Sequence, residues 1–270
     1  MPLDERQIER YLRHVVLAEI GGRGQERLLA SSVLVIGVGG LGAPAAYYLA
    51  AAGVGRIGLV DGDRVELSSL QRQILHHTPD LGRPKVESAA TKLRVLNPDC
   101  TLELHREFLD HDNILPLVER YDFVLDCTDG FPVKFLINDA CVLARKPFSH
   151  AGVLRWEGQT MTCLPWRSAS YRCVFGKAPP PDSVPTCAQA GVLGALVGTI
   201  GTIQATEAVK YLLGEGELLE DRLLVYDALR MRMRTVSVRR DPRWRPDEPH
   251  PDIRGLSPMD EGPACRRRNP

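Results

Sequence analysis

The first half of the chain alternates between short apolar runs and longer segments of helix-forming residues. Residues 31–37 (SSVLVIG) are typical of a buried strand, the alanine-rich residues 39–53 of a helix, and residues 56–61 (RIGLVD) of a second strand. A strand, a helix and a strand in this order predict a βαβ unit. The alternation continues with a helix over residues 83–96 and strands over 101–105 and 123–129. We therefore expect an α/β fold built on a mostly parallel sheet flanked by helices.

The ends of the chain and its second half carry other patterns. Apolar side chains within residues 4–18 follow the spacing of an amphipathic helix. After Pro147 we expect a strand over residues 158–164, an exposed Pro-rich loop, a helix over 192–213 and two late strands that form an antiparallel extension at the far edge of the sheet. From Asp241 the chain is rich in Pro and Arg and poor in large aliphatic residues, so disorder is expected. The prediction is one domain, residues 1–240, followed by a tail, residues 241–270.

Composition narrows the class of protein. Lys plus Arg and Asp plus Glu both total 34, so the formal net charge is zero and no nucleic-acid binding is expected. The N-terminus is charged and no apolar run reaches the roughly 18 residues of a membrane span, so we expect neither a membrane segment nor export. Seven scattered cysteines do not form the pattern of a disulfide framework. A cytoplasmic protein with reduced thiols is the natural interpretation.

A glycine-rich motif, GVGGLG, lies between the first predicted strand and the helix that follows it. Gly37 would permit a tight turn, Gly39 a close approach of phosphate to the backbone, and Gly42 close packing of the helix on the strand. Asp61 ends the second strand, where a carboxylate accepts hydrogen bonds from ribose hydroxyls. These features predict a Rossmann-like nucleotide site, with glycines that serve only packing as the alternative. They suit NAD as well as ATP, so an NAD-dependent oxidoreductase also fits them.

Two cationic side chains favour ATP over NAD as the bound nucleotide. Arg72 and Lys85 lie in the segments LSSLQRQ and GRPK, which follow the second strand. Fixed positive charges suit a triphosphate, because nucleotidyl transfer depends on positioning and on neutralising the charge of phosphate oxygens. NAD has less need of them, so the two residues together favour ATP.

A carboxylate that could bind Mg²⁺ follows the apolar strand FVLD. Asp129 lies in the sequence DCTDG at the carboxyl edge of the predicted sheet, where open α/β folds bind ligands. Such a carboxylate can hold Mg²⁺ against the phosphates. Asp126 is the alternative ligand, and either residue could instead cap the turn. We prefer Asp129.

Together these motifs resemble the ThiF/MoeB/HesA family of E1-like activating enzymes. The resemblance covers residues 6–240 and includes RYLRHVVL, GVGGLG, LVDGD, LSSLQRQ, GRPK, LDCTD, YRC and the long segment from CAQAG to AVKYL. It implies an adenylyltransferase: the C-terminal glycine carboxylate of a ubiquitin-fold sulfur carrier ending in Gly-Gly attacks the α-phosphate of ATP, and the carrier later becomes a thiocarboxylate. It also implies N-terminal helices over residues 1–30, a nucleotide-binding half over 31–150 and a carrier-binding half with a crossover loop over 151–240.

The resemblance assigns roles to residues by their position. Arg72 and Lys85 match phosphate contacts, and Asp129 matches the aspartate that binds the catalytic Mg²⁺. Arg13 matches the arginine that family members present to the γ-phosphate in the neighbouring subunit, which implies a homodimer. Nucleotide contacts are implied at Gly37, Gly39, Gly40, Gly42, Asp61, Asp63, Ser69, Gln73 and Gly130.

Cys187 matches a cysteine of the family's crossover loop. In some members this cysteine links covalently to the carrier or to the sulfur donor, which could be a cysteine desulfurase or a rhodanese. An exposed thiolate near cations is a useful nucleophile, and a structural thiol is the alternative. Carriers of this kind serve thiamine, molybdopterin, cysteine and tRNA thiolation pathways.

The chain departs from the family at a zinc site. Many relatives hold a structural zinc with two Cys-x-x-Cys pairs, and four thiolates complete a tetrahedral site. Here Ser170 stands where the partner of Cys173 would be, and Trp244 and Asp247 replace the second pair. We therefore predict no zinc, and we expect apolar packing that includes Trp244 to hold the late strands.

Three further departures concern single residues. Ser69 and Gly130 each replace a usual Asn, which could weaken nucleotide contacts. His150 replaces a small residue and is either a packing variant, which we favour, or a pocket residue that changes substrate choice. A catalytically silent binding module, suggested by the lost zinc ligands and Gly130, is an alternative to an adenylating enzyme. Within the adenylating enzymes, a relative acting on a tRNA-linked or small-molecule carboxylate is the alternative.

Overall fold

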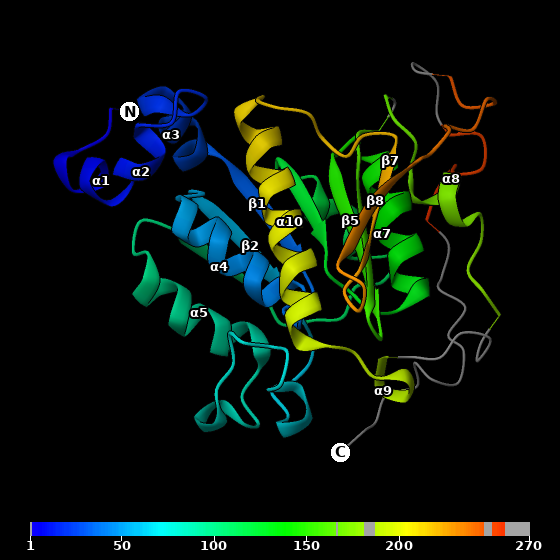
Figure 1. The fold of residues 1–270 in the computed structure, drawn as a ribbon, viewed down its shortest axis with the longest axis horizontal. Coiled ribbons are helices and arrows are strands. Elements are labelled where there is room, and N and C mark those ends of the chain that lie inside the picture. Colours follow the sequence, from blue (N-terminus) through cyan, green and yellow to red (C-terminus); the bar gives the residue numbers. More distant parts are fainter. Residues whose placement is uncertain (1, 166, 181–186, 246–249, 257–270) are drawn as a thin grey trace.

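An eight-stranded mixed sheet forms the centre of the computed structural model, which describes residues 2–165, 167–180, 187–245 and 250–256. The order across the sheet is β3-β2-β1-β4-β5-β6-β7-β8 (Figure 1). The first five strands run parallel to one another, and β6, β7 and β8 continue the sheet antiparallel. The strands are β1 (Ser32–Ile36), β2 (Arg56–Val60), β3 (Thr101–His105), β4 (Phe123–Asp126), β5 (Phe148–Leu154), β6 (Glu157–Cys163), β7 (Arg222–Asp227) and β8 (Arg232–Ser237). The predicted α/β class with an antiparallel C-terminal extension is confirmed.

Helices cover both faces of the sheet. All five residues of β1 are buried, because α4 and α10 pack on one face and α6 and α7 on the other. The long helix α10 runs across the front of the sheet beside α4 in Figure 1. The helices are α1 (Glu5–Arg10), α2 (Leu12–Val15), α3 (Gly21–Ala30), α4 (Gly42–Ala52), α5 (Lys85–Leu96), α6 (Ile114–Val118), α7 (Phe131–Leu143), α8 (Tyr171–Phe175), α9 (Cys187–Ala190) and α10 (Gly194–Leu213), with short 3₁₀ turns η1 (Leu67–Ser69) and η2 (Thr78–Asp80). None of the described helices is long and apolar enough to span a bilayer.

The N-terminal helices lie where β1 and β2 begin (Figure 1). The single helix expected over residues 4–18 is two helices, α1 and α2, because Tyr11 turns into the domain between them. The ring of Tyr11 is buried over Gly53, and its hydroxyl accepts a hydrogen bond of 2.8 Å from the side chain of Asn97. This contact fixes the N-terminal helices at the amino end of the sheet.

Part of the segment after Asp241 packs on the domain. Trp244 and Ile253 are buried against Val142 of α7. The disorder expected after Asp241 does not extend to these two residues, because their apolar side chains find a partner surface. The expected packing of Trp244 against the late strands is wrong, because its apolar cluster consists of residues of α7 and of the tail. Residues 246–249 and 257–270 lie outside the described residues.

Candidate nucleotide-binding site

Three neighbouring parallel strands end at the same edge of the sheet and carry most of the predicted site. Val60 of β2 pairs with Ile36 of β1, and Ile36 pairs with Asp126 of β4. Asp61 and the glycine turn (Gly37–Gly42) follow the first two strand ends directly, and Asp129 follows the third after two residues. The edge is therefore the place where an open α/β sheet binds a ligand.

The glycine turn is shaped by close backbone contacts. Gly37 has a φ of 89°, and a Cβ there would lie 2.9 Å from the carbonyl oxygen of Cys127. A Cβ at Gly42, where α4 begins, would lie 1.9 Å from the carbonyl oxygen of Gly37. Both residues must therefore be glycine for the turn to form, as the sequence predicts.

The two central glycines of the turn differ from each other. A Cβ at Gly40 would lie 2.7 Å from Cγ1 of Val197 in α10, so this glycine is required by helix packing. A Cβ at Gly39 would meet nothing closer than 3.5 Å, where the side-chain amide of Gln73 lies. Packing does not demand a glycine at position 39, which leaves close approach of a ligand as its physical reason.

Asp61 is fixed by the backbone of the glycine turn. Its carboxylate accepts hydrogen bonds of 2.9 Å from the N–H groups of Val38 and Asp63. Lys85, at the start of α5, lies 2.8 Å from Asp63 and 3.8 Å from Asp61. Burial raises the pKa of Asp61, and the ammonium of Lys85 opposes this shift. The structure thus brings Asp61, Asp63 and Lys85 together, with Lys85 ion-paired to the aspartates.

The segment after η1 brings a second cation to the turn. Arg72 donates a hydrogen bond of 3.1 Å to the carbonyl oxygen of Ser68, and its aliphatic stem lies alongside Gly40. Gln73 and Ser69 are buried below it. The oxygen Oε1 of Gln73 is buried and has no hydrogen-bond partner among the described residues. Arg72 and Gln73 therefore reach the glycine turn, as expected.

Asp129 is exposed, and no hydrogen bond or ion pair joins its carboxylate to another described residue. The turn that carries it is held by Asp126, whose carboxylate accepts hydrogen bonds of 3.1 and 2.7 Å from the N–H and the hydroxyl of Thr128. The next residue, Gly130, has an ordinary extended backbone and room for a side chain, so the usual Asn would fit there. A free carboxylate beside the glycine turn suits a hydrated Mg²⁺ ion.

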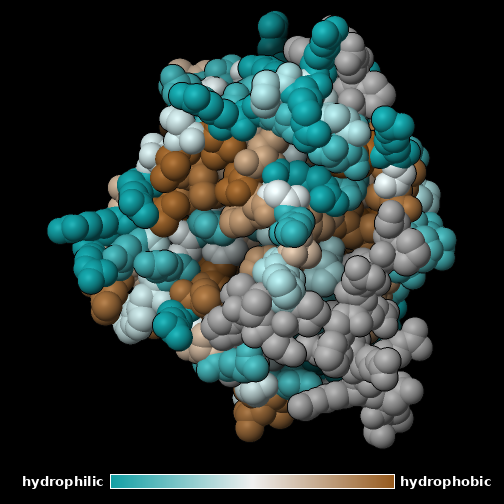
Figure 2. All heavy atoms as spheres, turned by 90° about the vertical axis from the view of Figure 1, so that its right-hand side faces the viewer, coloured by the Kyte–Doolittle hydropathy of each residue, from teal (hydrophilic) through white to brown (hydrophobic). Residues whose placement is uncertain are grey.

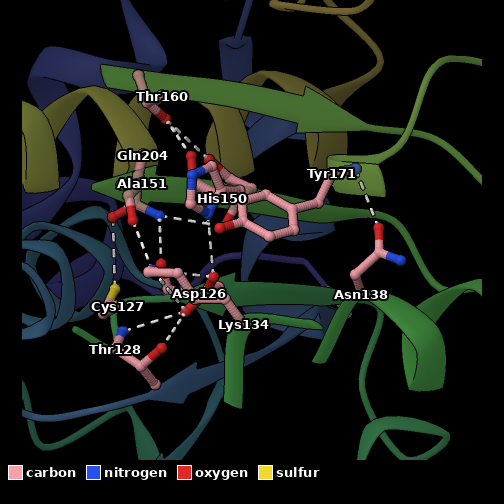
Figure 3. A network of polar contacts seen from close by, with 11 residues as sticks. Asp126, Cys127, Thr128, Lys134, Asn138, His150, Ala151, Thr160, Tyr171 and Gln204 are labelled. Atoms are coloured by element: carbon pink, nitrogen blue, oxygen red, sulfur yellow. Dashed lines mark hydrogen bonds and ion pairs between the residues drawn. The ribbon is translucent and has the colours of Figure 1, made fainter. Parts of the chain in front are cut away.

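Asp126, the alternative metal ligand, is buried in a network of polar contacts (Figure 3). Its carboxylate accepts hydrogen bonds from the hydroxyl of Thr128 at 2.7 Å and from the ammonium of Lys134 at 3.1 Å, and lies 3.1 Å from Nδ1 of His150. Burial alone would raise the pKa of Asp126, but the charge of Lys134 and these hydrogen bonds hold it at about 2. Asp126 is therefore engaged in holding the turn.

Lys134 and His150 are site residues that the sequence reasoning missed or undervalued. No sequence motif marks Lys134. His150 is buried against Tyr171 and Phe175, in agreement with the packing role that the sequence favours. Both contacts with Asp126 join separate elements, α7 and β5, to the end of β4.

Of the remaining predicted catalytic residues, Arg13 lies away from this group. Arg13 is exposed on α2, at the amino end of the sheet, whereas Asp129 lies at the carboxyl end. Within one chain these two residues therefore belong to opposite ends of the fold. Cys187 begins α9, and its side chain lies outside the part of the structure that can be described.

The expected loss of the zinc site remains a prediction. Cys173 lies beside Ser170, whose hydroxyl is 3.8 Å from the sulfur. Trp244 packs in the interior, and Asp247 is outside the described residues. Among the described residues, the acidic and histidine side chains that meet metal-ligand spacing are Asp110, His111 and Asp112, in the loop before α6.

The fold and the glycine turn define a Rossmann-type nucleotide-binding domain. Residues 11–245 match the ThiF family. The chain belongs to this family.

Curated relatives agree with this assignment. The SAMP-activating enzyme E1 of Haloferax volcanii is 50% identical over 90% of this chain and 89% of that protein. The sulfur carrier protein adenylyltransferase of Thermus thermophilus is 45% identical over 88% of this chain and 90% of that protein. The probable adenylyltransferase/sulfurtransferase MoeZ of Mycobacterium tuberculosis is also 45% identical, but the chain spans only 62% of its length.

Solved structures share the fold at lower identity. A crystal structure of E. coli MccB with MccA-N7isoASN superposes with a TM-score of 0.77 and 21% identity, and covers 86% of this chain and 73% of that chain. At this identity the likeness concerns the fold alone.

Proposed function

We propose that this protein is an Mg²⁺-ATP-dependent adenylyltransferase that acts on the C-terminal glycine of a ubiquitin-fold sulfur carrier. The observation that carries the proposal is the exposed carboxylate of Asp129, which follows Cys127 and Thr128 where their backbone borders Gly37, while the stem of Arg72 borders Gly40 of the same turn. The names of the two relatives that match along most of their length, an E1 and a sulfur carrier protein adenylyltransferase, support it. An NAD-dependent oxidoreductase, the other candidate from the glycine motif, has no such support.

The reaction follows from the charges at the strand ends. The carrier carboxylate attacks the α-phosphorus of ATP, a bond forms between them, and the bond to the β-phosphate oxygen breaks to release pyrophosphate. Asp129 would hold Mg²⁺, which when bound offsets the negative charge of the phosphates. Arg72 and Lys85 stabilise the charge that develops on the phosphate oxygens, and Asp61 accepts hydrogen bonds from the ribose. Both oxygens of Asp61 are already bonded, but a carboxylate has further lone pairs to offer.

The carrier would approach from the second half of the chain. β8 is the edge strand of the described sheet, where β7 is its one paired neighbour, and all of its residues are exposed. Hydrophobic side chains are exposed beside hydrophilic ones on the side of the molecule that lies to the right in Figure 1 (Figure 2). In β8 and just before it, Met231, Met233 and Val236 are exposed. An open edge with apolar side chains can dock a partner protein of the ubiquitin fold.

Further parts of the proposal rest on the family resemblance. Arg13 would reach the γ-phosphate of a partner subunit, which requires a homodimer. Cys187 would act as a nucleophile in sulfur transfer, with a cysteine desulfurase or a rhodanese as the donor. The structural zinc of many relatives would be absent. The protein would work in the cytoplasm.

Exchange of pyrophosphate into ATP tests the proposed reaction. It should require Mg²⁺ and a carrier that ends in Gly-Gly, and it should vanish when the last glycine is removed. Asp129→Ala should reduce exchange by at least 10²–10³-fold, the order expected for loss of a group that stabilises transferred charge. The control is Asp112→Ala, an exposed aspartate in a loop beyond β3. Exchange that survives in Asp129→Ala would contradict the assignment of the site.

A further inference from the structure

His76 is buried against the glycine turn, in the segment that carries Arg72 and Gln73. Only 3% of the residue is exposed, and its backbone N–H donates a hydrogen bond of 2.9 Å to the carbonyl oxygen of Gln73. Its ring reaches two other parts of the chain. Nε2 lies 2.9 Å from the carbonyl oxygen of Val38, and Nδ1 lies 2.9 Å from the hydroxyl of Ser88 in α5. His76 therefore joins three segments of the candidate site.

The contacts on both sides of the ring assign the hydrogens of His76. Lys92, which is ion-paired with Asp80, has an ammonium group that can only donate, and it lies 2.8 Å from the oxygen of Ser88. The hydroxyl of Ser88 then gives its own hydrogen to Nδ1 of His76. The carbonyl oxygen of Val38 can only accept, so Nε2 carries a hydrogen. Burial lowers the pKa of His76, so the ring is neutral near pH 7 and this is its one hydrogen on nitrogen.

Val38 is held at both ends of its backbone. Its N–H donates a hydrogen bond of 2.9 Å to the carboxylate of Asp61, and its carbonyl oxygen accepts the hydrogen bond from His76. Its side chain is buried in the main apolar core. Two side chains from separate segments therefore fix the peptide groups on either side of Val38.

The peptide group between Val38 and Gly39 has an unused donor. A trans peptide bond is planar, so the N–H of Gly39 points away from the carbonyl oxygen of Val38 and hence away from His76. No described residue accepts a hydrogen bond from this N–H. Gly39 is half-buried, whereas Val38 and His76 are buried. The contact with His76 therefore turns a backbone donor away from the interior.

The same histidine anchors the segments that carry the two predicted phosphate cations. Arg72 precedes His76 by four residues, and its aliphatic stem borders Gly40. Lys85 begins α5, three residues before Ser88. The glycine turn, Arg72 and Lys85 thus share one buried point of attachment.

We propose that His76 is a positioning residue for the triphosphate of ATP: it holds the peptide group after Val38 so that the N–H of Gly39 donates to a phosphate oxygen. His76 is too deeply buried to touch the nucleotide, so it acts through the backbone. A backbone donor that is already oriented binds an anion without having to rearrange first. The inference rests on the proposed function, because it requires the phosphates of ATP to lie at the glycine turn.

Two substitutions separate the nitrogens of His76. In His76→Gln the side-chain amide reaches about as far as Nε2 and can still donate to Val38. In His76→Asn the shorter amide can bond to Ser88 alone. We expect His76→Asn to raise the KM for ATP about tenfold, the order of one hydrogen bond, and to leave the KM for the carrier unchanged.

His76→Gln should keep a KM for ATP near that of the wild type. The control is His77→Asn, at the exposed neighbour, which should behave as the wild type. A purely structural role of His76 would instead lower the thermal midpoint of both variants at position 76 and would not separate ATP from the carrier.

The backbone amide of Gly39 provides the decisive measurement. Protein labelled with ¹⁵N-glycine is saturated with ATP and Mg²⁺, and the signal of Gly39 is identified as the one absent from Gly39→Ala. We expect ATP to shift this signal strongly in the wild type and in His76→Gln, and much less in His76→Asn. An equal shift in the wild type and in His76→Asn would overturn the role of His76 and leave the nucleotide site intact.

A second measurement reads the ring of His76 in the wild-type protein, so it does not depend on the folding of His76→Asn. The ¹⁵N shifts of the ring, identified by their loss in His76→Gln, should show a hydrogen on Nε2 and none on Nδ1. A hydrogen on Nδ1 alone would leave nothing to hold Val38 and would overturn the role as well. Absence of both pyrophosphate exchange and any glycine shift with ATP would instead contradict the proposed function, and this inference with it.

Discussion

Asp126 ends strand β4 and Asp129 follows it by three residues, yet the two carboxylates lie in opposite environments. That of Asp126 is buried and accepts hydrogen bonds from Thr128 and Lys134. That of Asp129 is exposed and makes no hydrogen bond or ion pair with a described residue. One carboxylate fixes the turn, which leaves the other free to bind a cation. The following predictions test this division and the site around it.

The buried pair of Asp126 and His150 should make stability fall in acid. The pKa of His150 is about 4 in the folded protein against about 6.5 when unfolded, so the unfolded chain takes up the proton first. Stability from this residue is present above pH 6.5 and is lost as pH falls toward 4, about 3 kcal/mol in all. Below pH 4, Asp126 adds a second loss as the pH approaches its folded pKa of about 2.

Denaturant unfolding between pH 7 and pH 4 measures this effect. His150→Asn should show a smaller loss of unfolding free energy than the wild type over that range, because Asn does not titrate. His111→Asn, at a more exposed histidine, is the matched control and should behave as the wild type. Parallel curves for wild type and His150→Asn would show that His150 is not the titrating group.

Two alanine substitutions in the glycine turn should change different properties. One should lower thermal stability, and the other should lower the affinity for ATP. Gly42→Ala places a Cβ 1.9 Å from the carbonyl oxygen of Gly37 and should lower the thermal midpoint by several degrees, because backbone must move. Gly39→Ala meets nothing within 3.4 Å and should fold normally. If phosphates approach Gly39, its ATP affinity should still fall about tenfold. Normal ATP titration of a folded Gly39→Ala protein would argue that the phosphates lie elsewhere.

The separation of Arg13 from Asp129 predicts complementation between subunits. Arg13→Ala and Asp129→Ala should each be inactive as homodimers. Mixed dimers carry one complete site, since each subunit would supply the residue that the other lacks. Random exchange of subunits should then restore up to about a quarter of wild-type activity. Activity that stays absent after subunit exchange, confirmed by a tagged pull-down, would show that Arg13 does not act across a dimer.

The lost zinc ligands predict stability that is independent of chelators. Trp244 and Ile253 pack on Val142, so apolar contacts can hold the segment that zinc would otherwise fix. Dialysis against EDTA should leave the thermal midpoint unchanged in the absence of ATP, and elemental analysis should find no stoichiometric zinc. A midpoint that drops on chelation and returns with Zn²⁺ would refute this.

Sequence patterns predicted the strands of the first βαβ unit better than the elements in the middle of the chain. Strands β1 and β2 are apolar at nearly every position because both sheet faces are covered, which is a strong signal. The sequence of β5 lacks such a signal, because Ser149, His150 and Gly152 interrupt its apolar residues. Helix α7 was not predicted because it is apolar on most sides and so lacks a clear period.

Local sequence motifs predict the residues of the candidate site that follow a strand end or begin a helix. Gly37, Asp61 and Lys85 come together because each follows a strand end or begins a helix at one edge of the sheet. The contact between Asp126 and His150 joins residues 24 positions apart, and sequence spacing alone cannot show that they pair. The register of β4 and β5 creates it.

The product of the reaction tests the central claim most directly. The carrier is incubated with this protein, ATP and Mg²⁺, and its intact mass is measured. The account predicts a carrier that gains one AMP, that loses it to hydroxylamine, and that stays unmodified with Asp129→Ala. A carrier that keeps its mass with the wild-type protein, while the protein binds NADH without competition from ATP, would contradict it.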